Sequence, residues 1–202
     1  MKEWYYDKLL NIRTGGDQKG FNKSQHYHRY EPTPYIAFEE LFNHYELKSS
    51  DRIVDFGCGK GRLNFFIHYL FNATVVGVEM NEPYYLEALE NKKKYLQKTK
   101  NRKDNIHFQL CYAEEYKIDP LDNKFYFFNP FSIQIFMNII NNILVSVEKA
   151  EREIELVLYY VSDDYVFYLE NCTAFKLKKE IILPILSERD PYEKFLIYRL
   201  SF

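Results

Sequence analysis

The stretch RIVDFGCGKGR, residues 52–62, decides the fold. Residues 53–56 form a short apolar run that contains one acid, Asp55, and they predict a buried strand. Three glycines at alternate positions follow, and the apolar residues 63–71 then predict a helix. A strand, a glycine turn and a helix in this order are typical of an α/β sheet that holds a nucleotide-like ligand at the carboxyl end of a strand.

The spacing of the glycines distinguishes between ligands. A dinucleotide fingerprint, Gly-x-Gly-x-x-Gly, needs a third glycine where this chain has Arg62. A phosphate-binding P-loop ends in Gly-Lys-Ser/Thr, whereas Lys60 is followed here by Gly61. The remaining pattern is Asp-x-Gly-x-Gly-x-Gly. A tight turn without a ligand is the alternative, but such a turn needs neither three glycines nor an acid.

This pattern resembles the first motif of class I S-adenosylmethionine (SAM) methyltransferases. The resemblance implies that SAM is the cofactor and that Asp55 faces its cationic amino-acid end. It also implies that the glycines let the cofactor lie against the backbone. The residues assigned to the cofactor in this loop are Asp55, Phe56, Gly57, Cys58, Gly59 and Gly61.

A second acid supports this interpretation. Residues 73–80 predict the second parallel strand, and Glu79 lies at its carboxyl end. A carboxylate in that place can accept hydrogen bonds from both ribose hydroxyls of an adenosine. The methyltransferase resemblance implies the same role for Glu79 and places Met80 beside the adenine. A solvated glutamate at an ordinary strand end is the alternative.

The third strand is predicted over residues 106–111. Class I methyltransferases commonly follow this strand with Asp-Ala, whose acid bonds the adenine amine. The corresponding pair here is Tyr112 and Ala113. The resemblance therefore implies adenine contacts at this pair, although a tyrosine does not reproduce the acid.

The second informative stretch is Asn129-Pro-Phe131, which follows a short aromatic strand at residues 125–128. It resembles the Asn-Pro-Pro-Tyr/Phe motif of methyltransferases that modify amino groups. The resemblance implies that Asn129 and the Pro130 carbonyl orient the acceptor beside the cofactor, and that Phe131 stacks on it. The second proline is missing, so the acceptor stays open among a small molecule, a protein side chain and an RNA base. The alternative is a turn that starts a helix, with Ser132 as its cap.

Residues 1–50 are predicted to form a lid or cap segment, and residues 51–202 the SAM-binding domain. A helix is predicted over residues 35–45, with Thr33 as its cap and Pro34 at its first position. The resemblance suggests that this segment folds over cofactor and substrate, and a helix that simply covers a sheet edge is the alternative. The lid candidates are Tyr27, Tyr30, Thr33 and Tyr35. No metal site is predicted, because His26 and His28 lack a third ligand.

Two further strands complete the parallel set, and two C-terminal strands with a short connection predict an antiparallel hairpin. The predicted fold class is therefore α/β, with a doubly wound, mostly parallel seven-stranded sheet and a C-terminal antiparallel hairpin, as in class I methyltransferases. A helix with a lysine-rich face is predicted over residues 81–100, capped by Asn81. The other predicted elements are a helix at 133–147, a strand at 154–161, a helix at 162–171, and strands at 175–183 and 195–200.

Composition limits the remaining choices. A chain of 202 residues is long enough for one domain with a full core, and its formal net charge of −2 does not indicate general nucleic-acid binding. Three cysteines far apart favour a reduced, cytoplasmic setting over a disulfide framework. No signal peptide or membrane span is expected, and the oligomeric state stays open. Two other functions remain as alternatives: a non-catalytic SAM-binding module and a dinucleotide-dependent oxidoreductase.

Overall fold

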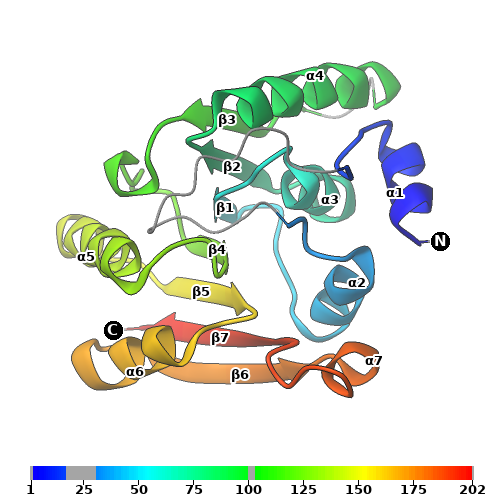
Figure 1. Ribbon diagram of the computed structural model, residues 1–202. Helices are drawn as coiled ribbons and strands as arrows, with labels where there is room; N and C mark the ends of the chain where they lie inside the picture. Colours follow the sequence, from blue (N-terminus) through cyan, green and yellow to red (C-terminus); the bar gives the residue numbers. More distant parts are fainter. Residues whose placement is uncertain (1, 17–30, 100–102, 202) are drawn as a thin grey trace.

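The computed structural model describes residues 2–16, 31–99 and 103–201 (Figure 1). Within them, seven strands form one sheet in the order β3-β2-β1-β4-β5-β7-β6. The first five strands are parallel, and β7 lies between β5 and β6, antiparallel to both. The strands are β1 Arg52–Phe56, β2 Thr74–Glu79, β3 Ile106–Leu110, β4 Lys124–Phe128, β5 Ile154–Tyr159, β6 Lys176–Ile182 and β7 Lys194–Leu200. The predicted fold class is confirmed.

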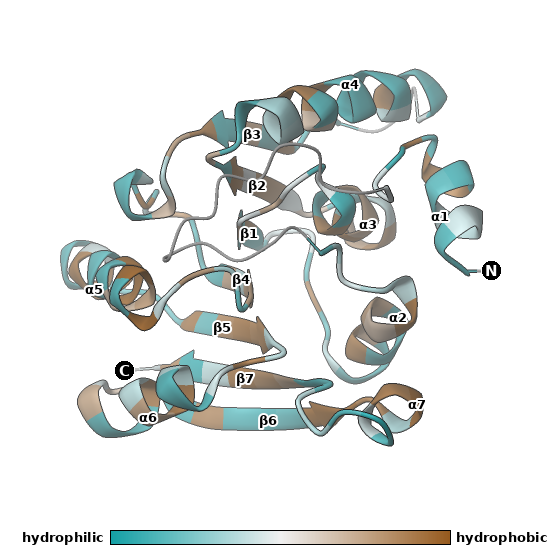
Figure 2. Cartoon of the chain, in the orientation of Figure 1, coloured by the Kyte–Doolittle hydropathy of each residue, from teal (hydrophilic) through white to brown (hydrophobic). Residues whose placement is uncertain are grey.

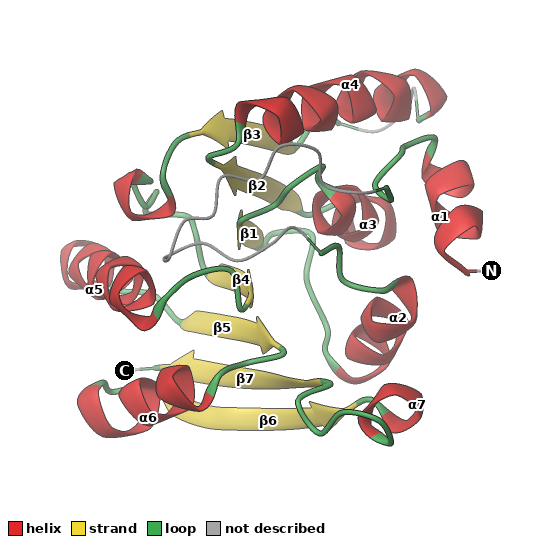
Figure 3. Ribbon diagram, in the orientation of Figure 1, coloured by secondary structure: helices red, strands yellow, loops and turns green. Residues whose placement is uncertain are grey.

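Helices cover both faces of this sheet (Figure 3). The helices are α1 Lys2–Leu10, α2 Tyr35–His44, α3 Arg62–Phe71, α4 Glu82–Lys98, α5 Ile133–Lys149, α6 Asp163–Cys172 and α7 Pro184–Ser187, with a 3-10 turn η1 at Ala113–Glu115. Helices α5 and α6 pack on one face, and α1, α2 and α3 contribute to the core on the other. The central strands are hydrophobic, whereas α4 is mostly hydrophilic (Figure 2). Helices α1 and α7 were not predicted.

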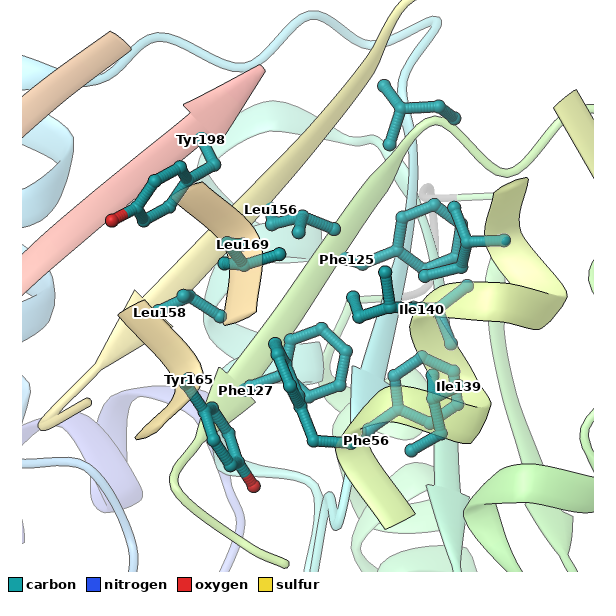
Figure 4. Packing of buried hydrophobic residues seen from close by; sticks show 14 of the residues in the cluster. Phe56, Phe125, Phe127, Ile139, Ile140, Leu156, Leu158, Tyr165, Leu169 and Tyr198 are labelled. Carbon is teal, nitrogen blue, oxygen red and sulfur yellow. The ribbon is translucent and has the colours of Figure 1, made fainter. Parts of the chain in front are cut away.

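Alternation along the strands divides the core between the two faces. In β1, Val54 and Phe56 belong to the cluster under α5 and α6, whereas Ile53 belongs to the cluster under α2 and α3. Figure 4 shows Phe56 and Phe127 of the sheet packed among side chains of α5 and α6. Asp55 alternates with Phe56, so it points toward the α2 and α3 face. This places the one acid of the strand beside the start of α3.

N-cap residues were predicted from the sequence for helices α4 and α2, and only the first prediction is confirmed. Asn81 caps α4 as predicted, because its side chain accepts a hydrogen bond from the Tyr84 backbone N–H at 3.2 Å. The predicted cap of α2 is wrong. Pro34 is the N-cap residue of that helix, and the Thr33 hydroxyl instead bonds the Tyr126 hydroxyl at 2.7 Å. Thr33 therefore joins the N-terminal segment to the central strand β4.

A buried arginine fixes the N-terminal segment to the start of α3. Arg62 is only 5% exposed, and its guanidinium donates to the Thr14 hydroxyl at 2.7 Å and to the Thr33 carbonyl at 3.0 Å. It also pairs with Glu3 of α1 and lies over the Tyr35 ring, 4.6 Å from its centroid. A single side chain beside the glycine turn thus holds three N-terminal stretches together.

A second connection comes from α4. The buried Asn91 amide donates to the Arg13 carbonyl at 3.0 Å and to the Lys60 carbonyl at 3.1 Å, and it accepts from the Arg13 N–H at 2.9 Å. The described part of residues 1–50 therefore contacts the glycine loop through several buried polar groups. The division of the chain at residue 50 remains a prediction. No helix in the described ranges has both the length and the apolar content that crossing a membrane requires.

Candidate functional site

The glycine loop lies where β1 ends and α3 begins, at the carboxyl edge of the sheet. Gly57, Gly59 and Gly61 all have positive φ, at 78°, 53° and 84°. The backbone N–H groups of Gly57 and Cys58 both bond the Val78 carbonyl, at 2.9 and 3.1 Å. The loop is therefore tied to the end of β2, which carries the second predicted acid.

Gly57 and Gly61 both lie close to other side chains, but the residues that they face differ. A Cβ on Gly57 would lie 3.1 Å from the Pro130 Cβ, so the Asn-Pro-Phe turn stands directly against this part of the loop. A Cβ on Gly61 would lie 2.7 Å from the Phe108 ring and 2.9 Å from the Phe65 ring. Packing alone therefore requires glycine at position 61, while Gly57 marks the junction between the loop and the end of β4.

Glu79 is held rigidly at the end of β2. One carboxylate oxygen accepts the Gly59 N–H at 2.8 Å, and the other accepts the Asn81 N–H at 2.7 Å. Burial raises the pKa of Glu79, although bonds from the backbone of Asn81, Gly59 and Met80 act in the opposite direction. Each carboxylate oxygen has a further lone pair. The geometry suits a carboxylate that accepts from two hydroxyls of a ligand.

Asp55 is buried, with 4% of its surface exposed. Burial, and secondarily the charge of Glu79, raise the pKa of Asp55 to about 8. With its amide oriented to satisfy both neighbours, Asn64 donates to Asp55 at 3.0 Å and accepts from the Gly77 N–H at 3.3 Å. No described residue forms a salt bridge with Asp55. The positively charged end of a ligand would supply the missing cation.

A cavity of about 30 Å³ lies beside Asp55. Its walls include Glu31, Thr33, Asp55, Gly57, Cys58 and Phe128. A space of this size holds a water molecule, and it is much smaller than an amino-acid side chain. Binding of a larger ligand at Asp55 therefore requires the walls contributed by residues 31–33 to separate from the glycine loop.

The predicted acceptor residue, Asn129, follows β4 at the same edge. It has a positive φ of 36°, and Tyr160 at the end of the neighbouring strand β5 has a φ of 52°. Phe128 pairs in register with Tyr159, so Asn129 and Tyr160 follow side by side. A positive φ is uncommon in residues other than glycine, and here it occurs in two such residues that follow neighbouring strands. The surrounding structure must enforce this backbone conformation, and residues of this kind cluster at functional sites.

Phe131 does not line the cavity as predicted. Its side chain is 3% exposed and belongs to the core under α5 and α6, and its carbonyl accepts from the Tyr165 hydroxyl at 2.7 Å. The aromatic residues that line the cavity beside Asp55 are Phe38, Phe56, Tyr126 and Phe128 instead, and Phe128 is the one next to Asn129 in the sequence. Sequence reasoning missed Phe128 because the aromatic run at residues 125–128 does not reveal which ring faces the site. Phe131 anchors the turn that carries Asn129.

The remaining predicted residues occupy different places. Met80 and Tyr112 follow β2 and β3, and their side chains are 39% and 50% exposed, so both can reach a ligand at Glu79. Ala113 is buried in η1. Tyr35 has no exposed surface and its hydroxyl donates to Asp7 at 2.8 Å, so the prediction that Tyr35 is a lid residue is wrong. Tyr27, Tyr30, His26 and His28 lie outside the described residues.

Comparisons with known proteins agree with this geometry. A family profile described as "Methyltransferase domain" matches residues 47–187. A comparison with curated proteins found no match.

Solved structures share the fold over most of their length. An RNA methyltransferase from Salinibacter ruber in complex with S-adenosyl-L-homocysteine matches with a TM-score of 0.58 and 15% identity, over 85% of this chain and 93% of that chain. A human methyltransferase 10 domain containing protein matches with a TM-score of 0.62 and 13% identity, over 99% and 94%. An rRNA methylase from Streptococcus thermophilus matches with a TM-score of 0.56 and 16% identity, over 86% and 99%. At these identities the likeness concerns the fold.

Proposed function

The chain belongs to the methyltransferase domain family, whose methyl donor is SAM, and from that premise we propose that it transfers the methyl group to a nitrogen atom of an acceptor held at Asn129. The observation that carries this proposal is the contact between Pro130 and the glycine loop, where a Cβ on Gly57 would lie 3.1 Å from the Pro130 Cβ. This contact supports the proposal because the turn proposed to hold the acceptor lies directly against the loop proposed to hold the cofactor. The family favours this activity over a dinucleotide-dependent oxidoreductase.

The residues of this chain suit the cofactor. Glu79 presents two fixed oxygens for the ribose hydroxyls, and Asp55 is a buried carboxyl that a cationic amino group would neutralise. Met80 and Tyr112 follow the ends of β2 and β3 and are exposed, which supports their proposed contact with the adenine. When bound, SAM supplies an electrophilic methyl group on a sulfonium.

The protein's contribution to such a transfer is alignment in a pocket that excludes water. The Asn129 side-chain oxygen would accept a hydrogen bond from the acceptor N–H, which directs the nitrogen lone pair toward the methyl group. The Pro130 carbonyl would accept a second one. Phe128 would contact the acceptor, because its ring lines the cavity beside Asp55. The nitrogen lone pair would form the new bond to the methyl carbon as the carbon–sulfur bond breaks, S-adenosyl-L-homocysteine would leave, and the methylated nitrogen would lose its extra proton to solvent.

Two of the similar structures are named as RNA or rRNA methylases, which makes RNA the second candidate for the acceptor. The formal net charge of −2 gives no general attraction to phosphate. A site on this protein that binds RNA would therefore need a local basic surface, for which the lysine-rich helix α4 is the candidate. A protein acceptor needs no such surface.

Calorimetry with SAM tests the cofactor site. Glu79→Gln is expected to weaken SAM binding about tenfold, because an amide nitrogen replaces one of two oxygens that accept backbone N–H groups and ribose hydroxyls. Glu82→Gln removes the same charge from an exposed position three residues along and is expected to bind SAM like the wild type. Equal weakening by both variants, or by neither, would contradict the assignment of Glu79.

SAM affinity is also expected to depend on pH through Asp55. Because the pKa of Asp55 is raised to about 8, the carboxyl in the free protein is mostly protonated below that pH. A cationic amino group favours the ionised form, so binding below pH 8 must release a proton. Because one proton is released for each SAM bound, the Kd for SAM is expected to fall about 50-fold between pH 6 and pH 8. Asp55→Asn should remove this slope, and an unchanged slope in that variant would rule Asp55 out as its source.

A further inference from the structure

A groove of about 440 Å³ lies between α6 and the β6–β7 hairpin, and it is called the α6–β7 groove below. Helix α6 lies beside these two strands at the edge of the sheet (Figure 1). The groove is more than ten times larger than the cavity at Asp55. Its walls are Val161, Asp163, Val166, Glu170, Leu177, Glu180, Pro191, Tyr192, Lys194, Leu196 and Tyr198.

The groove combines apolar surface with carboxylates. Val161, Val166, Leu177 and Leu196 supply apolar surface, and Leu177 is 47% exposed on β6. Three carboxylates line the walls, those of Asp163, Glu170 and Glu180. The groove's one lysine among the described residues, Lys194, pairs with Glu180 at 2.9 Å.

The carboxylates are positioned by neighbouring hydroxyls. The Tyr198 hydroxyl donates to Glu170 at 2.9 Å, and the Tyr192 hydroxyl donates to Asp163 at 3.3 Å. After the pairing of Lys194 with Glu180, two carboxylates still face the groove without a cation among the described residues. The groove therefore attracts a positively charged ligand and repels a polyanion such as nucleic acid.

Aromatic rings connect the groove to the acceptor site. The Tyr192 ring lies 5.8 Å from the Tyr160 ring, which in turn lies 6.4 Å from Phe128. The Tyr160 hydroxyl donates to Asp190 at 2.6 Å, so a further carboxylate lies along the same path. Phe128 lines the cavity at Asp55, and Tyr160 lies beside Asn129 in the register of β4 and β5. The contacts among Tyr192, Tyr160 and Phe128 thus link the groove to the proposed acceptor site.

We propose that the α6–β7 groove binds a peptide segment of the methyl acceptor that carries both basic and apolar side chains. Lysine or arginine side chains of that segment would pair with Asp163 and Glu170, and its apolar side chains would cover Leu177 and Leu196. This inference rests on the proposed methyl transfer, and it assigns the acceptor to proteins.

Peptide binding to the protein saturated with S-adenosyl-L-homocysteine tests the proposal. The probe is a fluorescein-labelled decapeptide of alternating lysine and leucine, and its Kd is measured by fluorescence anisotropy at low salt. The double variant Asp163→Asn/Glu170→Gln is expected to weaken binding about tenfold, because it removes the two groove carboxylates that no lysine or arginine among the described residues neutralises. The matched control, Glu46→Gln/Glu151→Gln, makes the same charge change at exposed positions outside the groove and should bind the peptide like the wild type.

An RNA 12-mer provides the competing outcome. Tighter binding of the RNA than of the peptide, or displacement of the peptide by the RNA, would overturn the proposal. Equal peptide affinity of the groove variant and the wild type would also overturn it. Calorimetry with SAM distinguishes a failure of the groove proposal from a failure of the proposed methyl transfer. A wild-type protein that binds the peptide through the groove but does not bind SAM would leave the groove assignment standing and remove the methyl transfer.

Discussion

Replacing Asn129 with glycine is expected to lower the rate of methyl transfer about 100-fold, while the Kd for SAM changes less than about threefold. The reason is that Asn129 orients the acceptor nitrogen, and misplacement of a reacting atom by about 1 Å can cost a factor of about 100. Glycine is the suitable replacement because Asn129 has a φ of 36°, which glycine adopts without strain. The substitution therefore tests the side chain and leaves the turn in place.

The measurement is the initial rate of labelled methyl transfer from saturating SAM into a protein fraction or an RNA fraction that the wild type methylates. Gln134→Ala is the control, because Gln134 is exposed in the first turn of α5 and lies close to Asn129 in sequence. That variant should transfer methyl at the wild-type rate. Full activity of Asn129→Gly would remove Asn129 from the acceptor site. An equal loss of SAM affinity and rate would instead assign Asn129 to the cofactor.

The sheet could be predicted because its signals are local. The first strand, the glycine turn and α3 follow one another within 20 residues, and each has its own pattern of apolar residues and glycines. The resemblance to class I methyltransferases, made on that turn, is confirmed by the matching family and by the sheet order. Helix α1 has no such signal. Only Leu10 is buried in it, and its position depends on contacts with residues far along the chain, such as Arg62 and Glu39.

A site residue on a strand could be predicted correctly only where the alternation of apolar and polar residues shows which face of the sheet its side chain lies on. Asp55 stands alone as an acid in an apolar run, and its position at a strand end could be inferred. The four residues of the run at 125–128 are all aromatic, so no alternation shows which ring faces the site. Phe128 was therefore missed, and Phe131 was predicted in its place. The structure resolves this because Phe125 and Phe127 belong to the core under α5 and α6, whereas Tyr126 and Phe128 line the cavity at Asp55.

The contacts of the lid candidates Thr33 and Tyr35 could not be predicted for a different reason, which is that their hydrogen-bond partners are far away in the sequence. Thr33 and Tyr35 resemble lid residues in sequence, because they are polar or aromatic and flank a proline. Their partners, Tyr126 and Asp7, lie 93 and 28 residues away. Pairings over such separations leave no local pattern. Thr33 nevertheless lines the cavity at Asp55, whereas Tyr35 is enclosed by the Arg62 contacts.

Arg62→Met is expected to lower the free energy of unfolding by about 3 kcal/mol. Methionine retains much of the buried volume, so packing is largely preserved. The Thr14 hydroxyl and the Thr33 carbonyl would each lose a hydrogen bond from a charged donor, made at 2.7 and 3.0 Å in a site that is 5% exposed. A bond from a charged donor to a buried acceptor contributes about 1.5 to 3 kcal/mol. Urea unfolding followed by circular dichroism measures the change.

Glu3→Gln is the control, because it removes only the half-exposed partner of Arg62, whose side chain is 49% exposed. The Arg62 side chain in this pair is only 6% exposed, but a glutamine oxygen can still accept from its guanidinium and from the Tyr35 N–H, so this variant should cost about 1 kcal/mol, less than Arg62→Met. A large difference between the two variants means that the N-terminal residues fold as part of the sheet domain, joined to the glycine loop. If Arg62→Met costs no more than Glu3→Gln, the N-terminal segment is a detachable lid, as the sequence alone suggested, and the cavity at Asp55 can open without disturbing the core.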